Sequence, residues 1–296
     1  MKIGAIFPQL EIGNDPAVIR DYAQAVEAMG FDHILVYDHV LGAHPDRFKD
    51  LYDGKFRPPY NHESIFHEPF VLFGYLAALT TRIELATGII ILPQRQAALV
   101  AKQAAEVDVL SGGRLRLGVG IGWNHVEYEA LGENFRNRGR RVEEQVALLR
   151  RLWTEDLVDF DGKYHTIHQA GIQPLPVQRP IPIWMGGMSD AAMRRIARIA
   201  DGWYPQQQAG PNGQDAVDRI RQYVTEAGRD PASFGIEGRL GLLTSTPEDR
   251  WAESLQWWRD IDATHVSLNT MGAKLPSPQA HIDLLRRFMD SVRAPR

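Results

Sequence analysis

Residues 181–204 read IPIWMGGMSDAAMRRIARIADGWY, and this stretch decides the fold. An apolar strand over 181–185 leads through two glycines into an amphipathic helix over 190–200, and a second apolar strand follows at 202–204. A strand, a helix and a further strand in this order are the repeating unit of a parallel sheet.

The same alternation continues in both directions along the chain. We expect strands at 3–7, 33–37, 83–88, 115–120, 181–185, 202–204, 234–238 and 265–268. We expect helices at 16–29, 68–80, 96–110, 137–152, 190–200, 214–228, 247–261 and 278–292. Eight strand–helix units close a parallel barrel, so the sequence predicts an α/β fold, a (β/α)8 TIM barrel. A doubly wound open sheet is the alternative, although it usually has fewer strands and a phosphate-binding loop in its first unit, which this chain lacks.

Two insertions interrupt the alternation. The first, residues 41–67, follows the second strand, and the other, 155–182, lies between the fourth helix and the fifth strand. The dipeptide Asp161-Gly162 in the second insertion predicts a hairpin turn between short strands. Because no shift in composition marks a boundary, we expect one barrel domain over residues 1–296.

The composition excludes several classes of protein. With 33 basic and 37 acidic residues the formal net charge is −4, which argues against nucleic acid as the partner. The chain has no cysteine, which rules out disulfides, thiolate metal ligands and a cysteine nucleophile. The N-terminus lacks the apolar core of a signal peptide, and no apolar run is long enough to span a membrane. We therefore expect a globular cytoplasmic protein with no membrane partner.

Two motifs stand where a parallel barrel carries its chemistry, at the carboxyl ends of the strands. Asp38-His39 follows the second strand and pairs a carboxylic acid with an imidazole that can handle protons near neutral pH. A capped strand end is the structural alternative. Gly186-Gly187 precedes a helix whose free backbone N–H groups would attract an anion. A plain turn capped by Ser189 or Asp190 is the alternative there.

Other motifs point away from function. The glycines at 118–122 have the spacing G-x-G-x-G, which is not the dinucleotide fingerprint, and suggest instead room for a flat group against the backbone. His62 and His67 frame H-E-x-x-x-H, one residue too long for a zinc-binding helix, so we expect no metal site. The arginine-rich run 136–141 is interpreted as a solvated loop and helix start.

Taken in order, several motifs resemble those of the bacterial-luciferase-like flavin and deazaflavin oxidoreductases, and most of all the branch that depends on coenzyme F420. The resemblance runs from Lys2 to about Tyr204. The motifs are Tyr37-Asp38-His39, TTRI at 80–83, LATGIIILP at 85–93, LSGGR at 110–114, GVGIGWN at 118–124, EYEALG at 127–132 and PIWMGG at 182–187.

This resemblance implies an F420-dependent oxidoreductase that moves a hydride between C5 of F420 and a small organic substrate. An FMN-dependent monooxygenase supplied by a separate reductase is the alternative, and a non-catalytic flavin-binding barrel is a third possibility. His39 is implied as the catalytic proton-transfer residue. The implied cofactor-binding residues are Asp38, His39, Thr87, Gly88, Ile89, Val119, Gly120, Ile121, Gly186, Gly187, Met188 and Ser189.

The family likeness also implies details of shape. A cis peptide between Gly88 and Ile89 would form a bulge behind the cofactor ring, and the Gly186-Gly187 turn would receive the cofactor phosphate. The chain departs from some F420 enzymes by carrying Ile121 in place of a carboxylic acid, which leaves His39 as the obvious proton-handling group.

The first insertion and the helix after it carry two further expectations. We expect the insertion to close over the substrate as a lid through its aromatic residues, which are Phe48, Tyr52, Phe56, Tyr60 and Phe66. The family likeness implies a homodimer that pairs through helices near strands two to four. The apolar residues expected there are Val71, Leu72, Tyr75 and Leu76.

Overall fold

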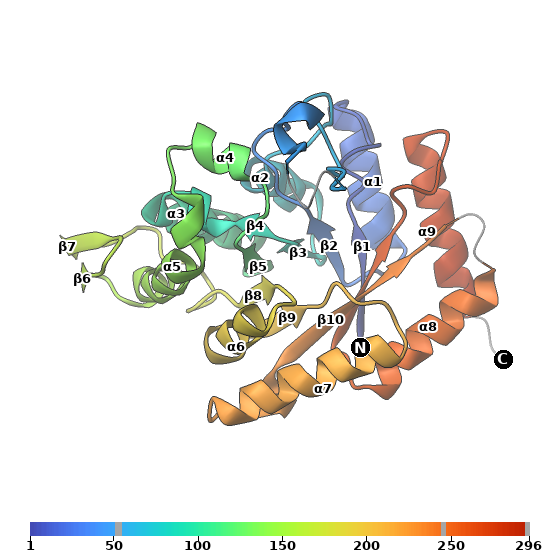
Figure 1. Cartoon of the computed structure of the whole chain (residues 1–296). Coiled ribbons are helices and arrows are strands. Elements are labelled where there is room, and N and C mark those ends of the chain that lie inside the picture. The colour runs from blue at the N-terminus through green and yellow to red at the C-terminus, as the bar shows by residue number, and fades with distance from the viewer. Residues whose placement is uncertain (51–54, 244–246, 294–296) are drawn as a thin grey trace.

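In the computed structural model, which describes residues 1–50, 55–243 and 247–293, eight parallel strands close into a barrel (Figure 1). They are β1 (Lys2–Ile6), β2 (His33–Val36), β3 (Glu84–Thr87), β5 (Leu115–Gly120), β8 (Ile183–Gly186), β9 (Gly202–Tyr204), β10 (Gly235–Gly241) and β11 (His265–Asn269). The pairing of β3 with β5 completes the ring, and the short strand β4 (Ile90–Ile91) continues along β5. The predicted (β/α)8 barrel is confirmed.

Helices surround this barrel, as the sequence pattern predicts (Figure 1). They are α1 (Pro16–Ala28), α2 (Pro69–Leu79), α3 (Ala97–Ser111), α5 (Arg138–Thr154), α6 (Asp190–Ile199), α7 (Pro211–Glu226), α8 (Glu248–Asp260) and α9 (Pro278–Arg293). Helix α6 shows why they form: Ser189 caps its N-terminus, and Met193 and Ile196 turn one apolar side into the core. None of the helices in the described residues is long and apolar enough to cross a membrane.

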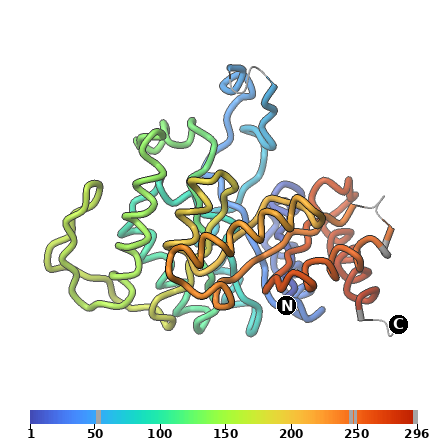
Figure 2. Tube along the Cα trace, turned by 60° about the horizontal axis from the view of Figure 1, so that its bottom comes forward, coloured from blue at the N-terminus to red at the C-terminus, as the bar shows by residue number. Residues whose placement is uncertain are grey.

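The two insertions leave the barrel at different places (Figure 2). The first contains one short 3-10 helix, η1 (Pro45–Phe48), in its described part. The second forms the expected hairpin from β6 (Val158–Asp161) and β7 (Thr166–Ala170). Its turn is held by Glu144 of α5, whose side chain accepts backbone N–H groups at Lys163 and Tyr164. A short helix, α4 (His125–Ala130), and a 3-10 turn, η4 (Phe135–Asn137), lie between β5 and α5, and the sequence pattern did not predict them.

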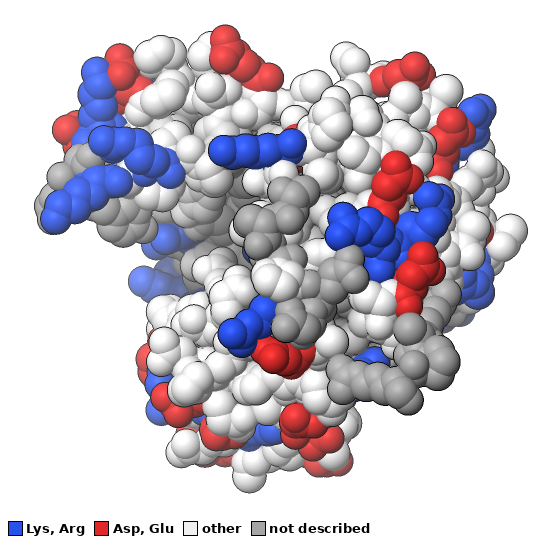
Figure 3. All heavy atoms as spheres, turned by 90° about the vertical axis from the view of Figure 1, so that its right-hand side faces the viewer, with Lys and Arg blue, Asp and Glu red and all other residues white. Residues whose placement is uncertain are grey.

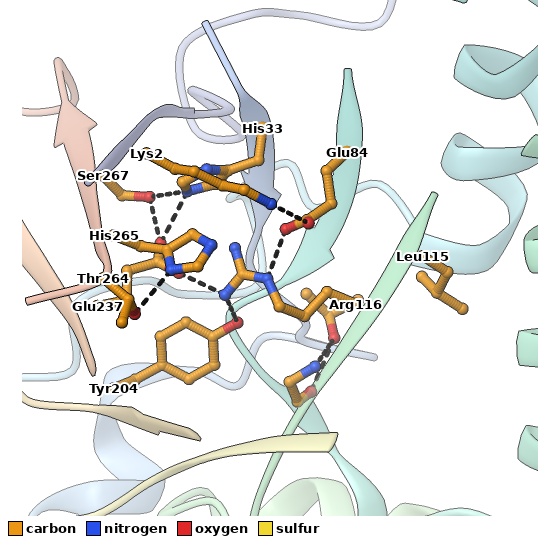
Figure 4. A network of polar contacts seen from close by, with 12 residues as sticks. Lys2, His33, Glu84, Leu115, Arg116, Tyr204, Glu237, Thr264, His265 and Ser267 are labelled. Carbon is orange, nitrogen blue, oxygen red and sulfur yellow. Dashed lines mark hydrogen bonds and ion pairs between the residues drawn. The ribbon is translucent and has the colours of Figure 1, made fainter. Parts of the chain in front are cut away.

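A buried ionic network fills the barrel near the amino ends of its strands (Figure 4). The Arg116 guanidinium lies between Glu84 and Glu237 and stacks on Trp184, with its Cζ 4.4 Å from the ring centroid. His33 Nε2 lies 3.0 Å from Glu237 Oε1. Burial raises the pKa of Glu237, but Arg116 and His33 lower it more, so this pKa falls well below its usual value. Each buried charge thus has an opposite charge as its partner.

The dimer expectation for α2 needs a correction. Leu72 and Leu76 are buried in the barrel core, whereas Val71 is 73% exposed and Tyr75 is 38% exposed. Because α2 is apolar on nearly all sides, its sequence does not show which face turns inward. Only Val71 and Tyr75 of these four are therefore available on the surface.

The face that carries α8 and α9 has charges of both signs close together (Figure 3). On α9, Arg286 NH1 lies 3.0 Å from Asp283 Oδ1, and on α8, Arg250 NH1 lies 2.8 Å from Glu253 Oε2. Exposed pairs of this kind contribute little to stability.

Candidate active site

A cavity of about 290 Å³ opens at the carboxyl ends of β2, β3, β5 and β8. This is the position at which a parallel barrel carries its chemistry. The lining residues are Tyr37, Asp38, His39, Gly88, Ile89, Ile91, Gly120, Ile121, Gly122, Trp123, Gly186, Gly187 and Gln206. The fold therefore brings most of the predicted site residues together.

The bulge expected after β3 is present, because the peptide bond between Gly88 and Ile89 is cis. The Ile89 side chain lies against β5, where a Cβ added to Gly120 would stand 2.5 Å from Ile89 Cδ1. Only glycine fits at position 120 while Ile89 holds this place. At this point the Ile89 side chain takes the space that a side chain from β5 would otherwise fill, and Ile89 lines the cavity.

Asp38 lines this cavity but uses both carboxylate oxygens within the protein. Oδ1 lies 2.7 Å from Arg95 NH2, and Oδ2 accepts the Ile91 backbone N–H at 3.0 Å. Burial raises the pKa of Asp38 above its usual value, and the Arg95 guanidinium opposes this rise. Arg95 also binds Glu68, the N-cap residue of α2, at 3.0 Å. Asp38 thus ties the end of β2 to β4 and to the start of α2.

His39 is oriented through its Nδ1 atom. Tyr60 Oη lies 2.7 Å from Nδ1, and Glu127 Oε1 lies 3.3 Å from it. Asn124 Nδ2 donates a hydrogen bond to Tyr60 Oη at 2.8 Å. The other ring nitrogen, Nε2, makes no hydrogen bond to the described residues. His39 therefore lines the cavity with its second nitrogen available to a ligand.

The sequence pattern did not show that Tyr60, Glu127 and Asn124 would surround His39. Glu127 is fully buried in α4 and accepts the Val40 backbone N–H at 2.8 Å. Glu127 belongs to the motif EYEALG, and this motif is the sequence feature that could have pointed to a role for its carboxylate. Asn124 precedes α4 as its N-cap residue. Tyr60 belongs to the first insertion, where no periodic pattern could show its direction.

The first insertion packs its aromatic side chains around Trp123 and His39. The ring centroid of Trp123 lies 5.4 Å from that of Phe48 and 4.9 Å from that of Phe56. Phe66 stands edge-on to His39 at 5.0 Å. The remaining residue of the predicted lid, Tyr52, lies outside the described residues. The insertion thus forms one wall of the site, and its closure over a substrate stays a prediction.

A second cavity, of about 660 Å³, shares Gly122 and Trp123 with the first. Met188 and Ser189 line it at the N-terminus of α6, where Ser189 Oγ accepts the Ala192 N–H at 3.3 Å. Arg138 also lines it. The arginine-rich run is therefore not wholly solvated as expected, because Arg138 is half-buried with its Cζ 3.7 Å from the Phe135 ring centroid. Arg138 Nε is buried without a hydrogen-bond partner in the described part of the chain.

Two of the expected cofactor-binding residues do not line either cavity. Thr87 is buried, and its Oγ1 donates to the Gly118 carbonyl at 2.7 Å and accepts the Gly118 N–H at 2.8 Å. Val119 is buried in the main apolar core. In a strand, alternate residues point to opposite sides, so Val119 faces away from its neighbours Gly118 and Gly120. The side chains of Thr87 and Val119 thus pack inside the protein, and a contact of these residues with a cofactor stays a prediction.

A family model described as luciferase-like monooxygenase matches residues 4–287 of this chain. The chain therefore belongs to the luciferase-like oxidoreductase and monooxygenase family. An uncharacterised protein of Mycobacterium tuberculosis is 38% identical over 215 residues, which cover 70% of this chain and 71% of that protein. The FMNH2-dependent dimethylsulfone monooxygenase of Pseudomonas putida is 33% identical over 180 residues, or 60% of this chain and 47% of that enzyme.

Solved structures of low sequence identity share the fold. An F420-dependent secondary alcohol dehydrogenase, in complex with an F420–acetone adduct, superposes with a TM-score of 0.78 at 18% identity and 99% coverage of each chain. The coenzyme F420-dependent tetrahydromethanopterin reductase of Methanopyrus kandleri gives 0.73 at 16% identity and 97% coverage of each chain. At such identities these likenesses describe the fold alone.

The residues present fit a flavin or deazaflavin. Gly88, Gly120 and Gly186 line the first cavity. At Gly186 the backbone faces open space, because an added Cβ would meet only Ile89 Cγ2 at 3.8 Å, and this leaves room for a flat ring. Tyr37 lines the first cavity and Arg138 lines the second, and each has a buried polar atom, Tyr37 Oη and Arg138 Nε, without a hydrogen-bond partner among the described residues. A bound polar ligand is one way to satisfy such atoms.

Proposed function

We propose that this protein is an oxidoreductase that uses coenzyme F420 to transfer a hydride to or from a small organic substrate. The observation that carries the proposal is the juxtaposition of His39 with the cavity wall formed by the Gly88–Ile89 bulge and the glycines of β5 and β8. When bound, the cofactor would supply the hydride chemistry. His39 would handle a proton at the substrate, and Trp123 with the first insertion would exclude water.

The charged and polar groups that line the larger cavity favour F420 as the cofactor. Arg138, Ser189 and the N-terminus of α6 meet in the larger cavity, and the Arg138 guanidinium can pair with a phosphate or carboxylate. The deazaflavin carries a long tail with a phosphate and several carboxylates, whereas FMN ends in one phosphate. The backbone at Gly186-Gly187 and the side chains of Met188 and Ser189 would receive the phosphate.

An FMN-dependent monooxygenase supplied by a separate reductase is the second candidate. The 33% identity to the FMNH2-dependent dimethylsulfone monooxygenase favours it, because that likeness lies in the sequence itself. The two candidates share the same cavity and differ in the cofactor and in the need for oxygen.

Binding and turnover together test the proposal. Titrations with F420 and with FMN, followed by quenching of tryptophan fluorescence, should show tighter binding of F420. Reduced F420 should then be consumed with a small organic substrate in the absence of oxygen. Tighter binding of FMN, with oxygen-dependent turnover of reduced FMN, would support the monooxygenase instead.

Arg138→Leu provides a sharper test of the tail. We expect F420 to bind about tenfold more weakly to this variant, since a charge-assisted hydrogen bond contributes about 1.5 kcal/mol. The deazaflavin without its tail serves as the matched ligand, and its affinity should not change. An equal loss for both ligands would show that Arg138 acts on the ring pocket or on folding rather than on the tail.

A further inference from the structure

The N-cap of α4 fixes the orientation of one side-chain amide beside the site. Asn124 is fully buried, and its Oδ1 accepts the Val126 backbone N–H at 3.0 Å. The amide nitrogen therefore points the opposite way, where Nδ2 donates to Tyr60 Oη at 2.8 Å. A flipped amide would place a donor against the Val126 N–H, so this assignment follows from the cap.

This amide determines where Tyr60 directs its own proton. Among the described residues, Asn124 and His39 are the hydrogen-bond partners of Tyr60 Oη. Because Asn124 donates, the phenol proton is directed to His39 Nδ1, 2.7 Å away. Burial raises the pKa of Tyr60 well above its usual value, so the phenol keeps a proton to donate. His39 Nδ1 is then an acceptor, and the imidazole proton lies on Nε2.

Glu127 is the competing partner of the same nitrogen. Its two carboxylate oxygens lie 3.3 and 3.5 Å from His39 Nδ1, beyond the range of a good N–H···O bond. Oε1 also accepts the backbone N–H groups of Val40 at 2.8 Å and Leu41 at 3.4 Å. A proton on Nδ1 would moreover leave the Tyr60 hydroxyl without an acceptor in the described part of the chain. The shorter contact, from Tyr60 Oη to His39 Nδ1, therefore favours the tautomer of His39 that carries its proton on Nε2.

We propose that Asn124 and Tyr60 act as positioning residues that hold His39 as the neutral Nε2–H tautomer, so that the site presents a hydrogen-bond donor to its substrate. A donor at this place selects a substrate whose reacting atom is an acceptor, such as a carbonyl oxygen. The tautomer follows from the contacts above, whereas its catalytic meaning rests on the proposed function.

In the reduction of a carbonyl, this donor would act on the oxygen. The hydride from the reduced cofactor bonds to the carbonyl carbon, and the electron pair of the C=O π bond moves to the oxygen. The Nε2–H group of the neutral imidazole would stabilise the charge that develops there and pass its proton to the oxygen, and His39 would regain a proton from water when the alcohol leaves. Two electrons and one hydrogen thus come from the cofactor, and one proton comes from water.

The tautomer is directly observable in protein labelled with 15N at histidine. Two-bond correlations between ring nitrogens and ring protons, recorded at about pH 8, distinguish Nε2–H from Nδ1–H and from the doubly protonated ring. His39→Gln identifies the His39 signals by their loss. We expect the Nε2–H pattern in the unaltered protein without added cofactor, which makes this result independent of the proposed function.

Two variants should move the proton to Nδ1. Tyr60→Phe removes the donor to that nitrogen. Asn124→Asp keeps the cap of α4 but turns the partner of Tyr60 into an acceptor, so that the phenol proton leaves His39. Phe66→Leu is the matched control, because Phe66 contacts His39 only through its ring, and it should leave the tautomer unchanged. Circular dichroism and melting temperatures verify that each variant is folded.

The outcomes separate clearly. An Nδ1–H or doubly protonated His39 in the unaltered protein, or an Nε2–H pattern that persists in folded Asn124→Asp, would overturn the tautomer assignment. For the substrate class, cyclohexanone and its hydrocarbon analogue methylenecyclohexane are added to protein saturated with F420. A larger shift of the His39 Nε2 signal with the ketone is expected, and equal effects would refute the carbonyl preference. Failure of F420 to bind would refute the proposed function and leave the tautomer result standing.

Discussion

Acidification from about pH 7.5 to about pH 5.0 should destabilise this protein, and His265 alone should account for about 2 kcal/mol of the loss. His265 is 9% exposed at the start of β11, and its ring stands edge-on to Trp184 with the centroids 4.9 Å apart. Burial, and then the nearby Arg116 guanidinium, lower the pKa of His265 from 6.5 to about 3. Burial, with the Arg116 charge beside it, thus disfavours the protonated form of this imidazole.

The sign follows from the direction of the shift. Because the pKa of His265 is lower in the folded protein, the unfolded chain binds the proton first as the pH falls. Its contribution to stability is complete above about pH 6.5 and is lost progressively toward about pH 3. In the unfolded chain the pKa of His265 is about 6.5. Protonation of His265 therefore stabilises the unfolded chain, relative to the folded protein, by about 2 kcal/mol between pH 7.5 and pH 5.0.

Urea unfolding followed by tryptophan fluorescence, at both pH values, measures this effect. His265→Asn removes the titrating group, so the variant should lose about 2 kcal/mol less than the unaltered protein over the same interval. His281, whose pKa is also lowered by burial, is present in both proteins and cancels in the difference. An equal loss of stability in both proteins would refute the assignment to His265.

Four further predictions concern the site and the surface. His39→Ala should leave cofactor affinity intact and lower kcat by about 10²–10⁴-fold, and a kcat that is unchanged at every pH would contradict its role. Gly186→Val should weaken cofactor binding about tenfold at constant melting temperature, because a Cβ at 186 meets only Ile89 Cγ2 at 3.8 Å and the added methyls fill the cavity. Gly187→Val should instead cost about 2 kcal/mol of stability, since φ is +148° and its Cβ would stand 2.9 Å from Ala192 Cβ; a fall in affinity alone would contradict this. Val71→Asp should convert the expected homodimer into a monomer in light scattering, and an unchanged mass of two chains would exclude α2 from the interface.

The barrel could be predicted because its signals are local. Asp161-Gly162 forms a turn wherever it joins two short strands, and Ser189 caps α6 through its own backbone. Short helices could not be predicted from such local patterns. Helix α4 spans only six residues, too few for a periodic pattern, although Asn124 before it is a typical N-cap residue.

The site could be predicted only in part, for the same physical reason. Strand ends gave His39 and Gly186, because a parallel barrel places all of them at one rim. The contact between Tyr60 and His39 depends on the path of an irregular insertion, and Arg138 reaches the second cavity only through the packing of α5 beside η4. The direction of the Thr87 hydroxyl, which donates to the Gly118 carbonyl, could not be predicted, because a strand end does not reveal whether a hydroxyl faces the cavity or a neighbouring strand.

The contact between Gly120 and Ile89 makes two positions of the cavity wall interdependent. Ile89 occupies the space that a side chain at 120 would need, so an alanine there requires the end of the Ile89 side chain to move or residue 89 to become shorter. Gly120→Ala and Ile89→Ala should therefore be strongly non-additive, with the double variant more stable than the sum of the single losses. The width of the pocket is consequently best changed by substituting residues 89 and 120 together. Libraries that vary one of these positions at a time would not contain such paired variants.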